Sequence, residues 1–172
     1  DYATALAIFR PLAEKGDAFS QFYMGDMYLS GLGVKQDYQK AIFWLSKAAE
    51  QGLVEAQYNL GDMYLTGQGV KQDDQQAAFW FHKAAEKGIA LAQQNLGAMY
   101  AIGQGVKQDY RQAEAWFRKA AKQGLDAAQH SLGVMYAKGE GVEQDYKQAE
   151  AWLRKAAEQG LMQAQSGLAK MA

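Results

Sequence analysis

The sequence predicts an all-α fold, specifically an α/α superhelix (solenoid) of 36-residue helix-turn-helix repeats. Glycine and tryptophan both return at this interval along the 172 residues, as Gly25, Gly61, Gly97 and Gly133 and as Trp44, Trp80, Trp116 and Trp152. A fixed period of about 20 to 50 residues is typical of stacked repeat arrays whose units share one continuous core. We therefore expect a single array over residues 1–172. No strand is expected, because no segment alternates with a period of two.

The first helix of each repeat is predicted from the segment Asp37–Glu50. Its apolar residues recur at helical spacing and form one face, made of Ala41, Trp44, Leu45 and Ala48. Asp37 is the expected N-cap, and its counterparts are followed three residues later by glutamine, which is the spacing of a capping box. Glycines in the left-handed conformation are expected to end these helices, at Gly52, Gly88, Gly124 and Gly160.

The second helix is predicted over residues 56–65, and its apolar face consists of Ala56, Leu60, Met63 and Tyr64. Gly61 lies inside this helix, where glycine costs about 1 kcal/mol relative to alanine. Its return in four repeats predicts a compensating close approach by a neighbouring helix. The tryptophan and methionine series fall on the predicted core stripes, so we expect them to serve packing.

Composition and charge exclude several classes of function. With 18 basic and 19 acidic residues, the net charge is -1, so neither nucleic acid nor a membrane surface is expected as a general partner. No apolar run approaches the roughly 20 residues of a transmembrane helix. There is no cysteine, and the two histidines, His82 and His130, lie in different repeats. We therefore expect no metal, no cofactor and no enzymatic activity.

The repeat pattern resembles the Sel1-like repeat family, which is related to the tetratricopeptide repeats. The resemblance is carried by Ala56-Gln57 with Leu60-Gly61-Asp62-Met63-Tyr64, by the loop Gly67–Val70, and by the segment Ala77–Ala85. It implies complete repeats at 17–52, 53–88, 89–124 and 125–160, with partial units at 1–16 and 161–172. Pro11, which replaces a recurring lysine, is expected to kink the first helix.

The resemblance also implies a function, that of a non-enzymatic scaffold which binds a peptide or protein segment on its concave helix face. Glycine-rich loops of this form are common in bacterial and often exported members, so a periplasmic or secreted bacterial protein is favoured over a cytoplasmic one. The chain is expected to be a monomer. Because the first residue falls on the repeat frame, we interpret the chain as trimmed. A β-lactam-related activity belongs to the cysteine-rich branch of the family, and this chain lacks those cysteines.

The candidate partner-binding residues lie on the helices that carry the Leu-Gly pair. In tetratricopeptide-like arrays this helix lines the concave side, and the stripe opposite the core residues should face inward. The two aromatic residues on it could anchor a partner, while the two aspartates would favour a basic group. The predicted set is Phe22, Asp26, Leu29, Tyr58, Asp62, Leu65, Gln94, Ile102, His130 and Val134.

Other interpretations of these surfaces stay open. The rings could fill space between adjacent helices, and the aspartates could be merely solvated. The array could instead be a structural module that joins copies of itself. A basic strip on the tryptophan helices could meet an acidic partner or anionic lipid, or only solvate a convex face, and it comprises Arg111, Arg118, Lys122, Lys147 and Arg154.

Overall fold

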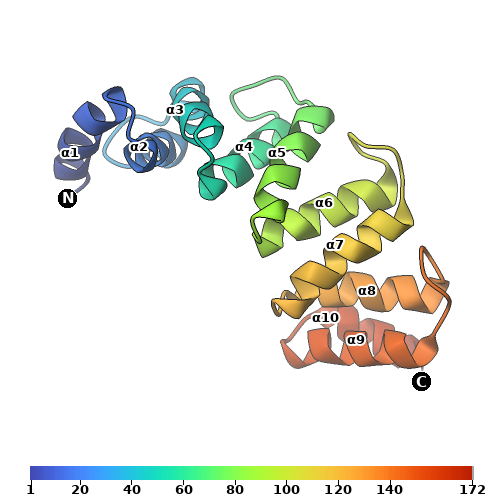
Figure 1. The fold of residues 1–172 in the computed structure, drawn as a ribbon. Helices are drawn as coiled ribbons and strands as arrows, with labels where there is room; N and C mark the ends of the chain where they lie inside the picture. The colour runs from blue at the N-terminus through green and yellow to red at the C-terminus, as the bar shows by residue number, and fades with distance from the viewer. Residues whose placement is uncertain (172) are drawn as a thin grey trace. The chain divides into compact units, whose positions relative to one another are not determined.

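The computed structural model describes residues 1–171 as ten α-helices, with no strand in that range. Figure 1 shows how the helices follow one another along the chain. Their bounds are α1 Tyr2–Glu14, α2 Ala18–Ser30, α3 Tyr38–Glu50, α4 Val54–Thr66, α5 Asp74–Glu86, α6 Ala90–Ile102, α7 Tyr110–Lys122, α8 Asp126–Lys138, α9 Tyr146–Glu158 and α10 Met162–Met171. The all-α repeat prediction is thereby confirmed.

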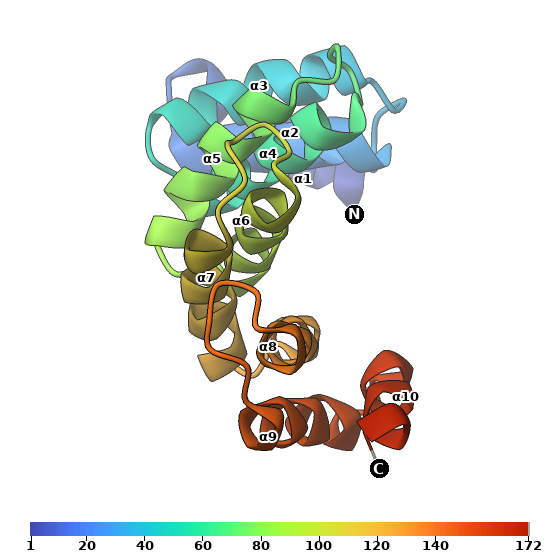
Figure 2. The ribbon, with the colours of Figure 1, turned by 90° about the vertical axis from the view of Figure 1, so that its right-hand side faces the viewer.

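The chain divides into two compact units, Asp1–Lys87 and Gly88–Ala172. In the first unit, each helix from α1 to α5 packs against the next one along the chain, and in the second unit α6 to α10 do the same. Figure 2 shows α9 beside both α8 and α10 within the second unit. That residues 1–172 form a single array stays a prediction.

The predicted helix ends are confirmed. The Asp37 carboxylate accepts a hydrogen bond from the Lys40 backbone N–H at 3.0 Å, which caps α3. Its counterparts cap α5, α7 and α9 in the same way, at Asp73, Asp109 and Asp145. The four predicted stop glycines all have positive φ, from 91° to 96°, at Gly52, Gly88, Gly124 and Gly160. α1 continues through Pro11 to Glu14.

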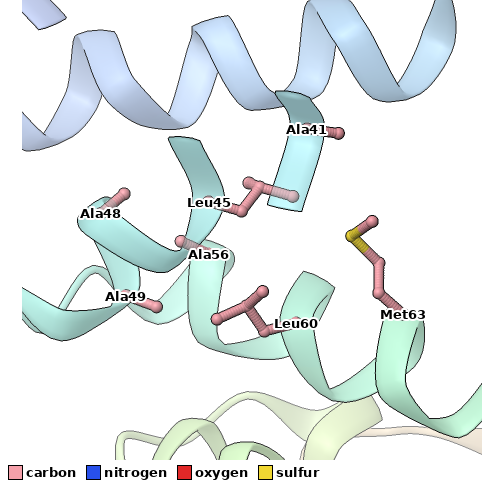
Figure 3. Packing of buried hydrophobic residues seen from close by; sticks show 7 residues of the cluster. All are labelled: Ala41, Leu45, Ala48, Ala49, Ala56, Leu60 and Met63. Carbon is pink, nitrogen blue, oxygen red and sulfur yellow. The ribbon is translucent and has the colours of Figure 1, made fainter. Parts of the chain in front are cut away.

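The core of the first unit lies between α3 and α4. Figure 3 shows Leu45 and three alanines of α3 together with the alanine, leucine and methionine of α4 that complete this cluster. The fully or almost fully buried members are Ala41, Leu45, Ala48, Ala49, Ala56, Leu60 and Met63. Because the alanines are so small, the two helix backbones approach each other closely.

Gly61 is required by a second close contact, between α4 and α5. A Cβ atom added at Gly61 would lie 2.6 Å from Cδ1 of Phe81, whose side chain is fully buried. Gly25 meets Leu45 in the same manner, and in the second unit Gly97 meets Phe117. The predicted close approach of a neighbouring helix is therefore confirmed.

In the second unit a polar network adds to the apolar core. Arg118 on α7 donates hydrogen bonds to the Glu114 carboxylate at 2.6 Å and to the Tyr136 hydroxyl on α8 at 2.6 Å. Burial alone would lower the pKa of Arg118, but these two hydrogen bonds raise it. The network therefore fixes α7 to α8 through a charge-assisted contact.

The expectation that all four tryptophans lie in the core is only partly right. Trp116 is 7% exposed, whereas Trp44, Trp80 and Trp152 are half-buried. The deepest position is the next one along each helix, where Phe81 has no exposed surface. The tryptophan precedes this deepest position by one residue, so its side chain is rotated by about 100° around the helix axis, away from the helix that carries the glycine. It lies at the edge of the core, where Lys155 stacks over Trp152 at 4.7 Å.

Glutamine side chains join neighbouring repeats within each unit. Gln21 donates to the Ala13 carbonyl at 3.1 Å, and its own oxygen accepts from Gln51, 30 residues further along, at 2.7 Å. Gln51 also donates to the Gly16 carbonyl at 3.0 Å. A further bridge of this kind in the first unit runs from Gln39 to the Gly69 carbonyl in the next loop, at 2.5 Å. The repeats are thus linked by directional polar contacts as well as by apolar packing.

Gly61→Ala should destabilise the protein by about 1–3 kcal/mol, because the added methyl group overpacks the contact with Phe81 and the gain in helix propensity is smaller. The free energy of unfolding, measured by urea denaturation, tests this. In a Phe81→Ala background the same change should no longer destabilise the protein and should stabilise it by up to about 1 kcal/mol, through the helix propensity of alanine. An equal cost in both backgrounds would show that Phe81 does not impose the glycine.

Phe81→Ala should cost about 3–5 kcal/mol, because it empties a site with no exposed surface. Trp80→Ala should cost at least about 1 kcal/mol less, since part of the indole already meets water. Thermal and urea melts of both variants measure the difference. A larger loss for Trp80→Ala would contradict the burial order of these two positions.

Candidate functional site

The predicted binding residues of the first unit are half-buried, all six of them. They come from two helices, with Phe22, Asp26 and Leu29 on α2 and Tyr58, Asp62 and Leu65 on α4. Phe22 and Leu29 pack against the core cluster of α3 and α4, and the Tyr58 ring lies 5.8 Å from that of Phe81. Each ring therefore contributes to packing and still presents part of its surface to solvent. We refer to these six residues as the α2–α4 stripe.

The two aspartates of the α2–α4 stripe have no structural partner, unlike the aspartates that cap helices. Asp26 and Asp62 each lie four residues after an aromatic residue of the stripe, hence one helical turn further along the same face. Within residues 1–171, neither carboxylate takes part in a hydrogen bond or an ion pair. A half-buried and unpaired carboxylate beside an aromatic ring is suited to a cationic group from outside.

The second unit places its predicted residues differently. Gln94, His130 and Val134 are half-buried, whereas Ile102 is 67% exposed. The Gln94 amide donates to the Ser131 hydroxyl at 3.5 Å, which is a side-chain contact between α6 and α8. Burial lowers the pKa of His130. This part of the predicted set is less aromatic than the α2–α4 stripe, and the described residues give it no acidic member.

The basic strip on the tryptophan helices is partly neutralised. Arg118 pairs with Glu114, and Arg154 pairs with Glu150 at 2.5 Å, each one turn earlier on its own helix. At the corresponding face of α3 and α5, lysines stack on exposed phenylalanine rings, with Lys47 and Lys83 each 5.0 Å from the ring centroid. Surface pairs of this kind contribute little free energy, and they reduce the positive potential available to an acidic partner.

A feature that the sequence reasoning missed lies beside α5. Gln57 is 5% exposed, and its amide donates to the Ala49 carbonyl at 3.1 Å. Its side-chain oxygen has no hydrogen-bond partner among residues 1–171, a state that costs about 1–3 kcal/mol. The sequence does indicate the missing partner, because position 87 holds lysine where the equivalent positions of other repeats hold glutamine, at Gln51, Gln123 and Gln159.

The comparisons with known proteins agree with the repeat geometry. The family described as Sel1 repeat matches residues 18–53, 54–89, 90–125 and 126–161. The chain belongs to the Sel1 repeat family. This fold is typical of protein–protein interaction scaffolds. No match was found among curated proteins.

Several solved structures are similar to this Sel1 repeat chain. A protective antigen present in uropathogenic Escherichia coli strains is 45% identical with a TM-score of 0.92, covering 96% of this chain and 36% of that one. A Sel1 repeat protein from Oxalobacter formigenes is 41% identical with a TM-score of 0.89, covering 100% and 50%. Helicobacter pylori cysteine-rich protein B is 28% identical with a TM-score of 0.57, covering 73% and 90%. This chain thus spans half or less of the length of the first two relatives.

Residues 1–171 of this Sel1 repeat chain contain no cluster of three or more histidine, cysteine, aspartate or glutamate side chains placed to hold a metal ion. None of the ten helices combines the length and the apolar character needed to cross a membrane.

Acidification should destabilise the protein partly through His130. Its pKa in the fold is lowered below the value of about 6.5 expected in the unfolded chain, so the unfolded chain binds more protons as the pH falls. The stability that neutral His130 contributes is present above about pH 6.5 and is lost as the pH falls through the lowered pKa. The melting temperature of wild type should therefore fall more between pH 7.5 and 5 than that of His130→Gln. Parallel pH profiles would show that this histidine is not responsible.

Proposed function

We propose that this Sel1 repeat array is a non-enzymatic scaffold that binds an extended peptide segment of a partner protein along the α2–α4 stripe. The observation that supports this most is the repeated pair of an aromatic residue and an unpaired aspartate, Phe22 with Asp26 and Tyr58 with Asp62. An aromatic side chain offers apolar contact area at low entropic cost, and a carboxylate one turn away selects for charge.

The chemistry of the stripe favours a particular peptide. Two half-buried rings and two leucines favour aliphatic or aromatic side chains, and two unpaired carboxylates favour lysine or arginine. The pair of an aromatic residue and an aspartate occurs once in each of two successive repeats. A peptide that alternates apolar and basic residues could therefore contact both pairs. Repeat arrays commonly bind extended segments in this way, because their surface offers equivalent contacts at regular intervals.

A structural role in self-assembly is the second candidate, and a specific observation favours it. Leu12 on α1 is 44% exposed, whereas Ala48, its counterpart on α3, is fully buried. Ile8, one turn earlier, is 55% exposed. A second copy could cover this face of α1. A solution mass that rises with protein concentration would favour assembly, while a constant monomer mass favours the peptide scaffold.

Asp62→Lys should weaken peptide binding at least tenfold, because it replaces attraction of a basic side chain by repulsion. The ligand is obtained by selecting a displayed library of random linear peptides on the full chain. The affinity of the best synthetic peptide is then measured by fluorescence anisotropy. Selected sequences should be rich in lysine or arginine next to an apolar residue, and their affinity should fall as salt is raised.

Two matched variants serve as controls. Glu55→Lys makes the same change in charge on an exposed part of α4 outside the stripe, and it should alter the affinity less than twofold. Tyr58→Phe keeps the ring and should bind like wild type, whereas Tyr58→Ala should lose affinity. If Glu55→Lys weakens binding as much as Asp62→Lys, net charge and not the stripe attracts the peptide, and the assignment is wrong.

A further inference from the structure

A pocket in the first unit corresponds to a place that a glutamine side chain of the chain itself occupies in other repeats. It is bordered by the end of α3, the start of α4 and the outer side of α5, and it is lined by Gly52, Gln57, Phe79, Trp80 and Lys87 among others. None of the residues that line it belongs to the α2–α4 stripe, so the pocket is separate from the site of the proposed function.

The other repeats show what this pocket accepts. Gln51 places its amide nitrogen between two oxygens, 2.7 Å from the Gln21 side-chain oxygen and 3.0 Å from the Gly16 carbonyl. Gln123 repeats the arrangement in the second unit, 2.9 Å from Gln93 and 2.9 Å from the Gly88 carbonyl. Gln159 donates to Gln129 at 2.8 Å. In each case one NH₂ group satisfies a buried glutamine oxygen of the preceding repeat.

The repeat around Gln57 lacks this internal donor. Lys87 stands where the bridging glutamine would be, and the Gln57 side-chain oxygen is buried without a hydrogen-bond partner within residues 1–171. Gly52, the counterpart of Gly16 and Gly88, lines the same pocket. The receiving oxygens are therefore retained while the amide that bridges them elsewhere is missing.

We propose that this pocket binds the side-chain carboxamide of a glutamine or asparagine from a partner protein, in the position that Gln51, Gln123 and Gln159 occupy in the other repeats. The ligand NH₂ group donates to the Gln57 oxygen and to the Gly52 carbonyl. Phe79, which is 49% exposed, and the half-buried Trp80 form an apolar wall for the neighbouring ligand residue. The flexible Lys87 side chain moves aside as the carboxamide enters.

A carboxamide fits this site better than the other common polar groups. A carboxylate has no proton to donate and would face two oxygens, which is repulsive. A hydroxyl has a single donor hydrogen and cannot serve both oxygens at once. An ammonium can also donate to both oxygens, and the lining holds two carboxylates, Glu50 and Glu86, beside Lys83 and Lys87. The carboxamide is favoured because a glutamine amide occupies the equivalent position in the other repeats.

The test uses the full chain and the synthetic peptide Ac-Gly-Leu-Gln-Gly-NHMe, whose only primary carboxamide is the glutamine side chain. Binding is followed by chemical-shift changes of the Gln57 side-chain amide and the Trp80 indole N–H in two-dimensional NMR spectra. The isosteric glutamate peptide at pH 7 is the matched ligand control. Saturable shifts are expected with the glutamine peptide and none with the glutamate peptide.

Two variants at one position separate the site from a general surface effect. Lys87→Gln supplies the missing internal amide, so it should raise the melting temperature and lower peptide affinity at least tenfold. Lys87→Ala leaves the pocket open and should bind the peptide at least as well as wild type. The proposal is overturned if wild type shows no saturable shift, or if Lys87→Gln binds the glutamine peptide as wild type does. Loss of peptide binding on the α2–α4 stripe would not affect either result.

Discussion

The contact between a helix glycine and a large side chain on the following helix determines how closely the hairpins pack. Gly25 against Leu45, Gly61 against Phe81, Gly97 against Phe117 and Gly133 against Leu153 repeat this contact, and a Cβ atom at any of these glycines would come within 2.7 Å of the facing side chain. The alanines serve the α3–α4 interface in a similar way, because small side chains make good contacts when the backbones are close. Trp44, Trp80 and Trp152 then lie at the border of the core, while Trp116 is buried.

The close packing of the helices also excludes water from the glutamine side chains, so these side chains need hydrogen-bond partners within the protein. A buried glutamine needs a partner for both its donor and its acceptor, and at this distance the partner can only come from a neighbouring repeat. Gln21 meets this requirement through two partners, because its amide donates to the Ala13 carbonyl and its oxygen accepts from Gln51. Gln57 shows what happens when one partner is changed, because its oxygen stays buried while the bridging position has become Lys87. A different residue at one surface position thus decides whether a buried oxygen accepts a hydrogen bond.

Much of the fold could be predicted from the sequence, because the decisive features are local and recur. Asp37 as an N-cap, Gly52 as a stop and Gly61 as a contact glycine each follow from the conformation or the space that one residue requires. The degree of burial of Trp80 could not be predicted in this way. Trp80 and Phe81 lie about 100° apart on the same helix, so both fall on its apolar face, one at the centre of the core and the other at the edge. Only the placement of the facing helix decides which of Trp80 and Phe81 is deeper. For the α2–α4 stripe, the pattern indicated the residues, while their half-burial depends on contacts with the next helices.

The hydrogen bonds between repeats have a consequence for how such a protein can change in length. Gln39 reaches the Gly69 carbonyl in the next loop, and Gln51 reaches back to Gly16, so each of these bonds joins units that are adjacent in sequence. A glutamine donor of this kind therefore meets an equivalent acceptor if one whole unit is removed or duplicated at matching positions, and the exception is the repeat in which Lys87 replaces the bridging glutamine. Recombination between repeats would conserve these bonds, whereas a deletion of half a unit would leave them without partners. The chain can thus vary its length in steps of 36 residues while these glutamine contacts between units are kept.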